Sequence, residues 1–151
     1  MKTINMHSRC TLTSLSLVFS LMTAFSQPVL AAEALQYQPA VVTLEGYVDM
    51  QQFDGPPNYG DGPDDKKVYV PVLHLDSPIT VNPAPNTPNE DPDSEAESNV
   101  TELQILAAKG QVKANGCYRI TGTLMHQVIA DHYTKVLITL NSAQPSASCN
   151  N

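Results

Sequence analysis

The stretch from Gly116 to Leu140 constrains the fold most, because it contains two runs of alternating apolar residues joined by a short polar segment. Apolar residues occupy every second position, and β-branched residues are frequent in both runs. This period of two is typical of β-strands with one buried face. We therefore predict a β-hairpin, and its buried faces comprise Tyr118, Ile120, Gly122 and Leu124 in the first strand and Val136, Ile138 and Leu140 in the second.

Three shorter segments upstream have the same character. Residues 40–50, 68–75 and 79–81 are rich in Val, Leu, Ile and Tyr, and segments rich in Gly and Pro lie between them. Glycines within the first strand and within the hairpin, Gly46 and Gly122, indicate bulged or strongly coiled strands. Pro71 cannot donate a hydrogen bond to a neighbouring strand, so this end of its strand should be an edge or a bulge.

One helix is expected between the third strand and the hairpin. Asn99 can cap it, Glu102 follows three residues later as in a capping box, and Gly110 can end it. The resulting order predicts a mainly β fold, a small OB-like five-stranded barrel with one helix between strands 3 and 4. A β-sandwich is the alternative, but it does not explain a single helix at that place. The expected apolar face of the helix comprises Val100, Leu103, Leu106 and Ala107.

The first 31 residues have the features of a secretory signal peptide. Two basic residues precede an apolar run that is too short for a membrane span, and small residues follow it. We predict cleavage after Ala31, with Ala34 as a second choice, and export to the periplasm or the medium. The predicted parts are then a signal peptide at 1–31, a short lead at 32–39, an OB-like domain at 40–141 with a mobile, unstructured acidic loop at 82–98, and a C-terminal tail at 142–151.

Charge and cysteine content narrow the class of protein. The expected mature chain keeps six basic and all fifteen acidic residues, a formal charge of −9, which excludes nucleic acid and anionic membranes as partners. No later apolar run could span a bilayer. In an oxidising compartment we predict that Cys117 and Cys149 form a disulfide, the alternative being two free thiols.

Several short motifs resemble the bacterial domain of unknown function 4431 family, and together they span most of the mature chain. The resemblance implies a small exported domain and supplies no established activity. The motifs occur in the order Val42–Gly46, Gly55–Tyr59, Leu75–Ile79, Asn99–Gln104, and Gly122–Leu124 followed by His126.

Two histidines and an aspartate in the polar part of the hairpin, His126, Asp131 and His132, form a candidate metal site. Two imidazoles and a carboxylate are enough to hold Zn²⁺ with one open position. The alternative is that these side chains are only solvated or hydrogen-bonded. No nucleophile or oxyanion partner accompanies them, so we expect neither catalysis nor a cofactor.

A geometric argument supports a binding function instead. In OB-type barrels, the loop after strand 1 and the loop between strands 4 and 5 flank the ligand-binding face. Aromatic rings beside polar groups in these loops suit a protein, peptide or glycan of the cell envelope. We thus predict a monomeric, exported, non-catalytic binding or envelope-maintenance module, with a metal-binding domain as the alternative. The predicted ligand-binding residues are Phe53, Pro56, Asn58, Tyr59, His126, His132, Tyr133 and Thr134. The competing interpretation is that the aromatic and proline residues only pack the first loop onto the barrel.

Overall fold

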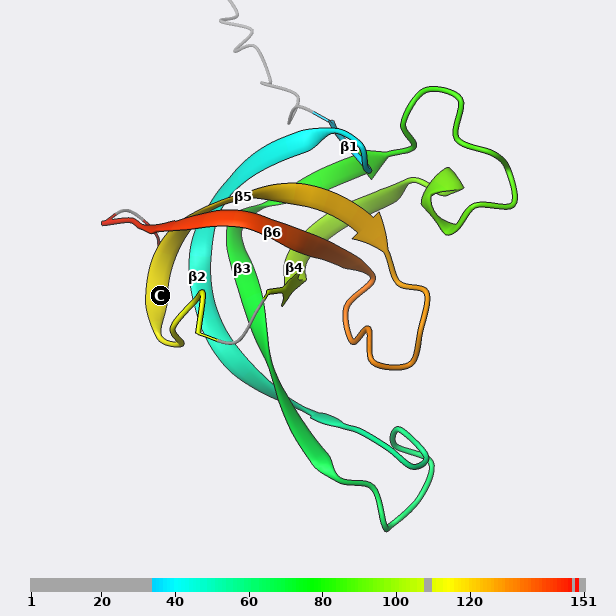
Figure 1. Ribbon diagram of the computed structural model, residues 1–151, viewed down its shortest axis with the longest axis vertical. Coiled ribbons are helices and arrows are strands. Elements are labelled where there is room, and N and C mark those ends of the chain that lie inside the picture. The colour runs from blue at the N-terminus through cyan, green and yellow to red at the C-terminus, as the bar shows by residue number, and fades with distance from the viewer. Residues whose placement is uncertain (1–33, 108–109, 148, 150–151) are drawn as a thin grey trace, which may run out of the picture. The chain divides into compact units, whose positions relative to one another are not determined.

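The computed structural model describes residues 34–107, 110–147 and 149, and it is mainly β (Figure 1). Its elements are β1 (Leu35–Gln36), β2 (Val41–Asp54), β3 (Lys67–Asn82), the short 3-10 helix η1 (Pro92–Ser94), β4 (Glu97–Leu106), β5 (Gly116–His126) and β6 (Val136–Pro145). Within the described ranges, no helix is long and apolar enough to cross a membrane. The predicted signal peptide lies outside the described residues.

The strands form one mixed sheet that rings round on itself. β2 pairs with β3 and β5, β4 joins β3 to β6, and β5 pairs with β6, so each of the five long strands has two neighbours (Figure 1). β4 and β6 run parallel, and the other long pairs are antiparallel. β1 adds to the end of β3 as a short parallel strand. The prediction of a mainly β fold is confirmed.

The inner face of the ring follows the alternation of the sequence. In β5, every second residue is buried, as predicted for Tyr118, Ile120 and Leu124. All five long strands contribute to one hydrophobic core, whose burial is the main stabilising term of such a sheet. The buried core residues are Tyr37, Val42, Leu44, Val48, Leu73, Val81, Val100, Leu103, Ile105, Tyr118, Ile120, Leu124, Val136 and Ile138.

The segment before β2 takes part in this core. Tyr37 is fully buried, and burial, together with the negative charges of Glu97 and Asp93, raises its pKa well above the usual value. The backbone N–H of Gln38 donates to the carbonyl of Leu124 at 2.8 Å, which ties the segment to β5. Residues 35–39 of the predicted short lead are thus part of the packed domain.

Both mid-strand glycines lie where two backbones approach closely. A Cβ at Gly46 would collide with the carbonyl oxygen of His74, and one at Gly122 with that of Thr139. Gly46 also pairs with both β3 and β5, and the register between β5 and β6 shifts next to Gly122. The register shift next to Gly122 agrees with a bulge, one of the two features predicted for this position. Glycine is required at both positions because there is no room for a side chain.

The helix predicted from Asn99 to Gly110 is wrong. Residues Glu97–Leu106 form β4, which pairs with β3 on one side and with β6 on the other. The spacing of its apolar residues fits a helix as well as a strand, and pairing with two neighbouring strands overrides the local capping signals. Asn99 has a positive φ of 58° inside the strand, so it belongs to a bulge and not to a helix cap.

The two strands predicted at 68–75 and 79–81 are one continuous strand, β3. The ladder with β4 shifts register between His74 and Ile79, so Pro78 lies in an irregular part of the strand and not in a turn. Pro71 pairs with Met50 of β2, and pairing of β3 with β4 begins only at Val72. Pro71 therefore lies at an edge position, as its missing N–H requires.

The acidic segment 82–98 was predicted to have no structure of its own, and this is wrong. It contains η1, and the side chain of Asp93 is only 6% exposed. Its carboxylate accepts hydrogen bonds from the backbone N–H of His126 at 2.6 Å and from Gln38 Nε2 at 3.0 Å. A buried aspartate thus fixes this segment to the end of β5.

The predicted disulfide agrees with the structure, and the predicted tail begins as a strand. Cys117 and Cys149 form a pair with a Cα–Cα distance of 5.8 Å. β6 continues to Pro145, so the first residues of the predicted tail 142–151 belong to the sheet.

Candidate functional site

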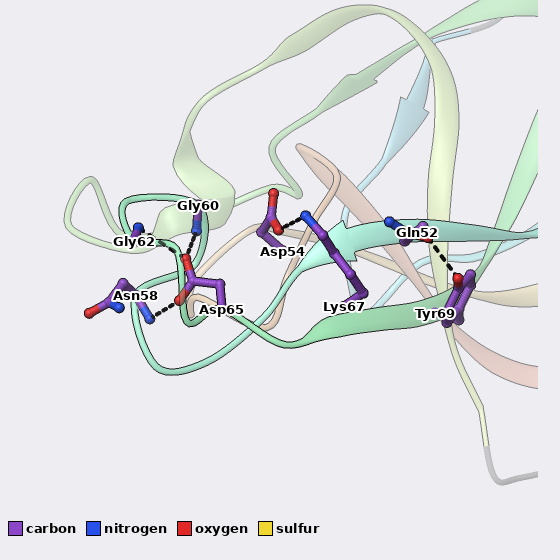
Figure 2. A network of polar contacts seen from close by, with 8 residues as sticks. All are labelled: Gln52, Asp54, Asn58, Gly60, Gly62, Asp65, Lys67 and Tyr69. Atoms are coloured by element: carbon purple, nitrogen blue, oxygen red, sulfur yellow. Dashed lines mark hydrogen bonds and ion pairs between the residues drawn. The ribbon is translucent and has the colours of Figure 1, made fainter.

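The loop between β2 and β3, residues 55–66, is organised by one carboxylate. Asp65 accepts hydrogen bonds from the backbone N–H groups of Asn58 at 2.6 Å, Gly60 at 2.7 Å and Gly62 at 3.2 Å (Figure 2). Burial opposes ionisation of this carboxyl, but the three N–H donors outweigh it and hold the pKa of Asp65 below its usual value. Where the loop joins its two strands, Asp54 and Lys67 form an ion pair between β2 and β3 (Figure 2). The loop therefore has a defined shape at neutral pH.

The loop between β5 and β6, residues 127–135, is anchored by a buried glutamine of β4. Gln104 is 5% exposed and bonds to the loop with its backbone and with both polar atoms of its side chain. Its N–H donates to Thr134 Oγ1 at 2.8 Å, its Nε2 donates to the carbonyl of Asp131 at 3.1 Å, and its Oε1 accepts from the N–H of Tyr133 at 2.7 Å. These bonds hold Tyr133 and Asp131 in place over β4.

His132 supports the same loop from within. It is 7% exposed, and its Nδ1 accepts a hydrogen bond from the N–H of Val128 at 3.1 Å. Its carbonyl accepts from the side chain of Gln127. These bonds make His132 a residue that shapes the loop.

The two loops meet through aromatic side chains. Phe53, near the end of β2, stacks on Tyr133 with a centroid distance of 4.7 Å and an interplanar angle of 19°. Tyr59 Oη donates to Asp131 Oδ1 at 3.1 Å, and this bond raises the pKa of Tyr59 above its usual value of 10.0. Burial, followed by the charge of Asp131, raises the pKa of Tyr133 as well. Two segments far apart in the sequence are thus joined by a stack and a hydrogen bond.

Two neighbouring cavities lie at this junction. The first, which we call the cleft, has a volume of about 340 Å³, and the second has a volume of about 400 Å³. Both are within the lower range of ligand pockets. The cleft is lined by Phe53, Ser98, Asn99, Val100, Thr101, Glu102, Tyr133, Thr134 and Lys135, and the second cavity by Phe53, Asp54, Tyr59, Gln127, Ala130, His132 and Tyr133.

The structure brings most of the predicted ligand-binding residues together. Phe53, Tyr59, His132, Tyr133 and Thr134 each line at least one of the two cavities. The other three do not line them. Pro56 and Asn58 shape loop 55–66, and His126 lines a separate cavity beside η1.

The three candidate metal ligands are engaged elsewhere. His126 Nε2 lies 3.2 Å from Glu97 Oε1, Asp131 accepts from Tyr59, and His132 accepts from Val128. Across residues 34–107, 110–147 and 149, no group of three or more His, Cys, Asp or Glu side chains is arranged to hold a metal ion. The structure therefore lends no support to a site made of His126, Asp131 and His132.

Three features of the site were missed from the sequence. Of the β4 residues that line the cleft, Asn99–Glu102 were assigned to a helix and Ser98 to the acidic loop, and Gln104 was not predicted as a site residue. The available signal was a lone glutamine between Leu103 and Ile105, since a polar residue within an apolar run must find hydrogen-bond partners when it is buried. Asp65 lies among other aspartates, and the sequence does not distinguish it from Asp61 and Asp64.

Comparison of the chain with known protein families, with characterised proteins and with solved structures found no match. The resemblance to the domain of unknown function 4431 family stays a prediction.

Proposed function

We propose that this protein is an exported, non-catalytic binding module that holds its ligand in the cleft between β4 and loop 127–135, beside the junction of this loop with loop 55–66. The observation that carries the proposal is the junction of the two loops, in which Phe53 stacks on Tyr133 and Tyr59 bonds to Asp131 beside the cleft. A concave site that combines aromatic rings with a few oriented polar groups is typical of ligand recognition.

The strand arrangement supports the same proposal. Counting the long strands from β2, the ring has the order 1-2-3-5-4, with the third and fifth strands parallel. We interpret this ring as an OB-like barrel that lacks the expected helix. In that architecture, ligands bind to the face of strands 2 and 3 between the loop after strand 1 and the loop between strands 4 and 5. Those are β3, β4 and the two loops, which meet beside the cleft.

Export and a place in the cell envelope are part of the proposal. They rest on the signal-peptide pattern of residues 1–31 and on the Cys117–Cys149 pair, since disulfides persist in oxidising compartments. The acidic charge of the chain makes nucleic acid and anionic membranes poor partners.

An affinity experiment tests the proposal. The mature protein, a Phe53→Ala/Tyr133→Ala variant and a Tyr69→Ala control are immobilised and exposed to an envelope extract of the producing cells. Tyr69 is 59% exposed, bonds to Gln52 and does not line either cavity, so it is a matched aromatic control (Figure 2). We expect one peptide, glycan or protein fraction to be retained by wild type and control and lost from the double variant. Equal retention by all three proteins, or no retention by wild type, overturns the proposal.

A further inference from the structure

The cleft lies where a parallel ladder opens. β4 and β6 pair from Leu103↔Val136 to Leu106↔Thr139, and no pairing continues toward the start of β4. In the described chain, residues 97–102 therefore have a strand neighbour, β3, on one side only. The cleft occupies the space between this part of β4, Phe53 and the segment 133–135 that leads into β6.

The backbone direction in this region follows from Gln104. Its N–H points toward loop 127–135, because it donates to Thr134 Oγ1. In an extended strand the N–H and C=O groups of every second residue point the same way. The N–H and C=O of Glu102 therefore point into the cleft. Such an open edge is a template for the addition of another strand.

We propose that the ligand of the cleft is an extended peptide that adds as a strand to residues 98–102 of β4, an inference that rests on the proposed function. An added strand gains affinity from main-chain hydrogen bonds and specificity from alternate side chains. The stacked rings of Phe53 and Tyr133 form an apolar wall for one such side chain. Because each ring covers one face of the other, these two facing surfaces are not open to stack on a sugar.

The charged side chains around the cleft indicate the charge of the peptide that would bind there. The two loops and the linings of both cavities carry six carboxylates and two lysines, and a third lysine, Lys67, pairs with Asp54. The remaining excess of negative charge favours a peptide with Lys or Arg side chains. The carboxylates are Asp54, Asp61, Asp64, Asp65, Glu102 and Asp131, and the lysines are Lys66 and Lys135.

A randomised heptapeptide library displayed on phage is the probe. Binders are selected from it separately on three immobilised proteins: the mature protein, a Thr101→Trp variant in which the new side chain fills the cleft, and a Thr43→Trp control. Thr101 and Thr43 are both exposed strand residues, and only Thr101 lines the cleft. We expect sequences rich in Lys or Arg to be enriched on wild type and control and not on Thr101→Trp. No enrichment on wild type above Thr101→Trp overturns the inference.

N-methylation of the peptide backbone tests whether the best peptide binds to β4 as an added strand. This test uses the wild-type protein, so it does not depend on the folding of Thr101→Trp. One series carries N-methyl groups on odd residues and the other on even residues. Because only alternate N–H groups face β4, one series should lose about tenfold or more in affinity and the other should bind nearly as before. Equal effects in both series overturn the inference. A glycan array run in parallel separates the proposed binding site from the proposed peptide ligand. If a glycan binds to wild type and not to Thr101→Trp, the cleft is the binding site but its ligand is not a peptide.

Discussion

Gln104 is the residue that links the sheet to the candidate site. Its side chain lies on the outer side of β4, since its neighbours Leu103 and Ile105 point into the core. A buried amide is tolerated only when its donors and acceptors are paired, and here both are paired with the backbone of loop 127–135. The position of Tyr133, and with it one wall of the cleft, therefore depends on a single glutamine.

Replacing Gln104 with Leu should destabilise the protein by about 2 kcal/mol, because the N–H of Tyr133 and the carbonyl of Asp131 lose their partner in a partly buried place. Urea unfolding measures the change in the free energy of unfolding, and the chemical shifts of the Tyr133 ring report on the loop. Gln52→Leu is the matched control, since Gln52 is exposed and its side chain accepts a hydrogen bond from the exposed Tyr69. A stability loss of equal size in both variants would contradict this role of Gln104.

Glu97 should make stability depend on acid pH. Its hydrogen bond with His126 and the positive charge of Lys135 hold its pKa below the usual 4.5. Because the folded pKa is lowered, the stabilisation is fully present above pH 4.5 and is lost as the pH falls through the folded value. Glu97→Gln should thus be less stable than wild type at pH 6, and the difference should shrink toward pH 2. Denaturant unfolding across this range measures it, with exposed Glu95→Gln as the control. A difference that is constant with pH would refute the interaction.

Among the elements, β4 shows where sequence reasoning stops. Asn99, Glu102 and Gly110 carry the signals of a helix start and end, and Val100 and Leu103 fit either period. What decides between helix and strand is the pairing of β4 with β3, which comes from upstream, and with β6, which comes from downstream. Such long-range pairing leaves no local trace in the sequence, so the helix was predicted and the wall of the cleft was missed.

The hairpin and the glycines, in contrast, were predictable because their causes are local. Alternation along β5 fixes its buried face, and Gly122 marks the close backbone approach within the strand itself. The meeting of Phe53 and Tyr59 with loop 127–135 was inferred from the expected architecture, which places both loops beside one face. The tie between Asp93 and β5 had no signal, since an aspartate in an acidic, Pro-rich segment is usually solvated.

The close approaches at the glycines lead to a prediction about β2 and β5. Gly46→Ala and Gly122→Ala should each destabilise the protein by about 3 kcal/mol or more, because the new methyl group meets a backbone carbonyl that the ladder holds in place. Gly116→Ala is the comparison, since its Cβ would lie 3.1 Å from the ring of Tyr118, which can shift by a small amount. Thermal unfolding of the three variants measures the order of their stabilities. If Gly116→Ala were the most harmful, the proposed crowding would be wrong.

At the scale of the whole molecule, the ring closes through contacts between residues distant in sequence. The first long strand, β2, pairs with β5, so this ladder joins the beginning of the described chain to its last hairpin. Ordering such a ring requires closing long loops, which costs conformational entropy before the core can form. The Cys117–Cys149 bond reduces part of this cost, because it links the start of β5 to the segment after β6.

Removal of this bond tests how far the ring depends on it. The two cysteines are 32 residues apart, and a bond closing a loop of that size stabilises a domain by roughly 3–4 kcal/mol in the chain-entropy model. A Cys117→Ser/Cys149→Ser variant should lose about that much free energy of unfolding, as measured in urea. Neither cysteine lines the cleft, so the ring signals of Phe53 and Tyr133 should be unchanged in the folded variant. Loss of the Phe53–Tyr133 contact without the disulfide would mean that the bond also shapes the binding face, and an unchanged stability would show that the ladders alone hold the ring.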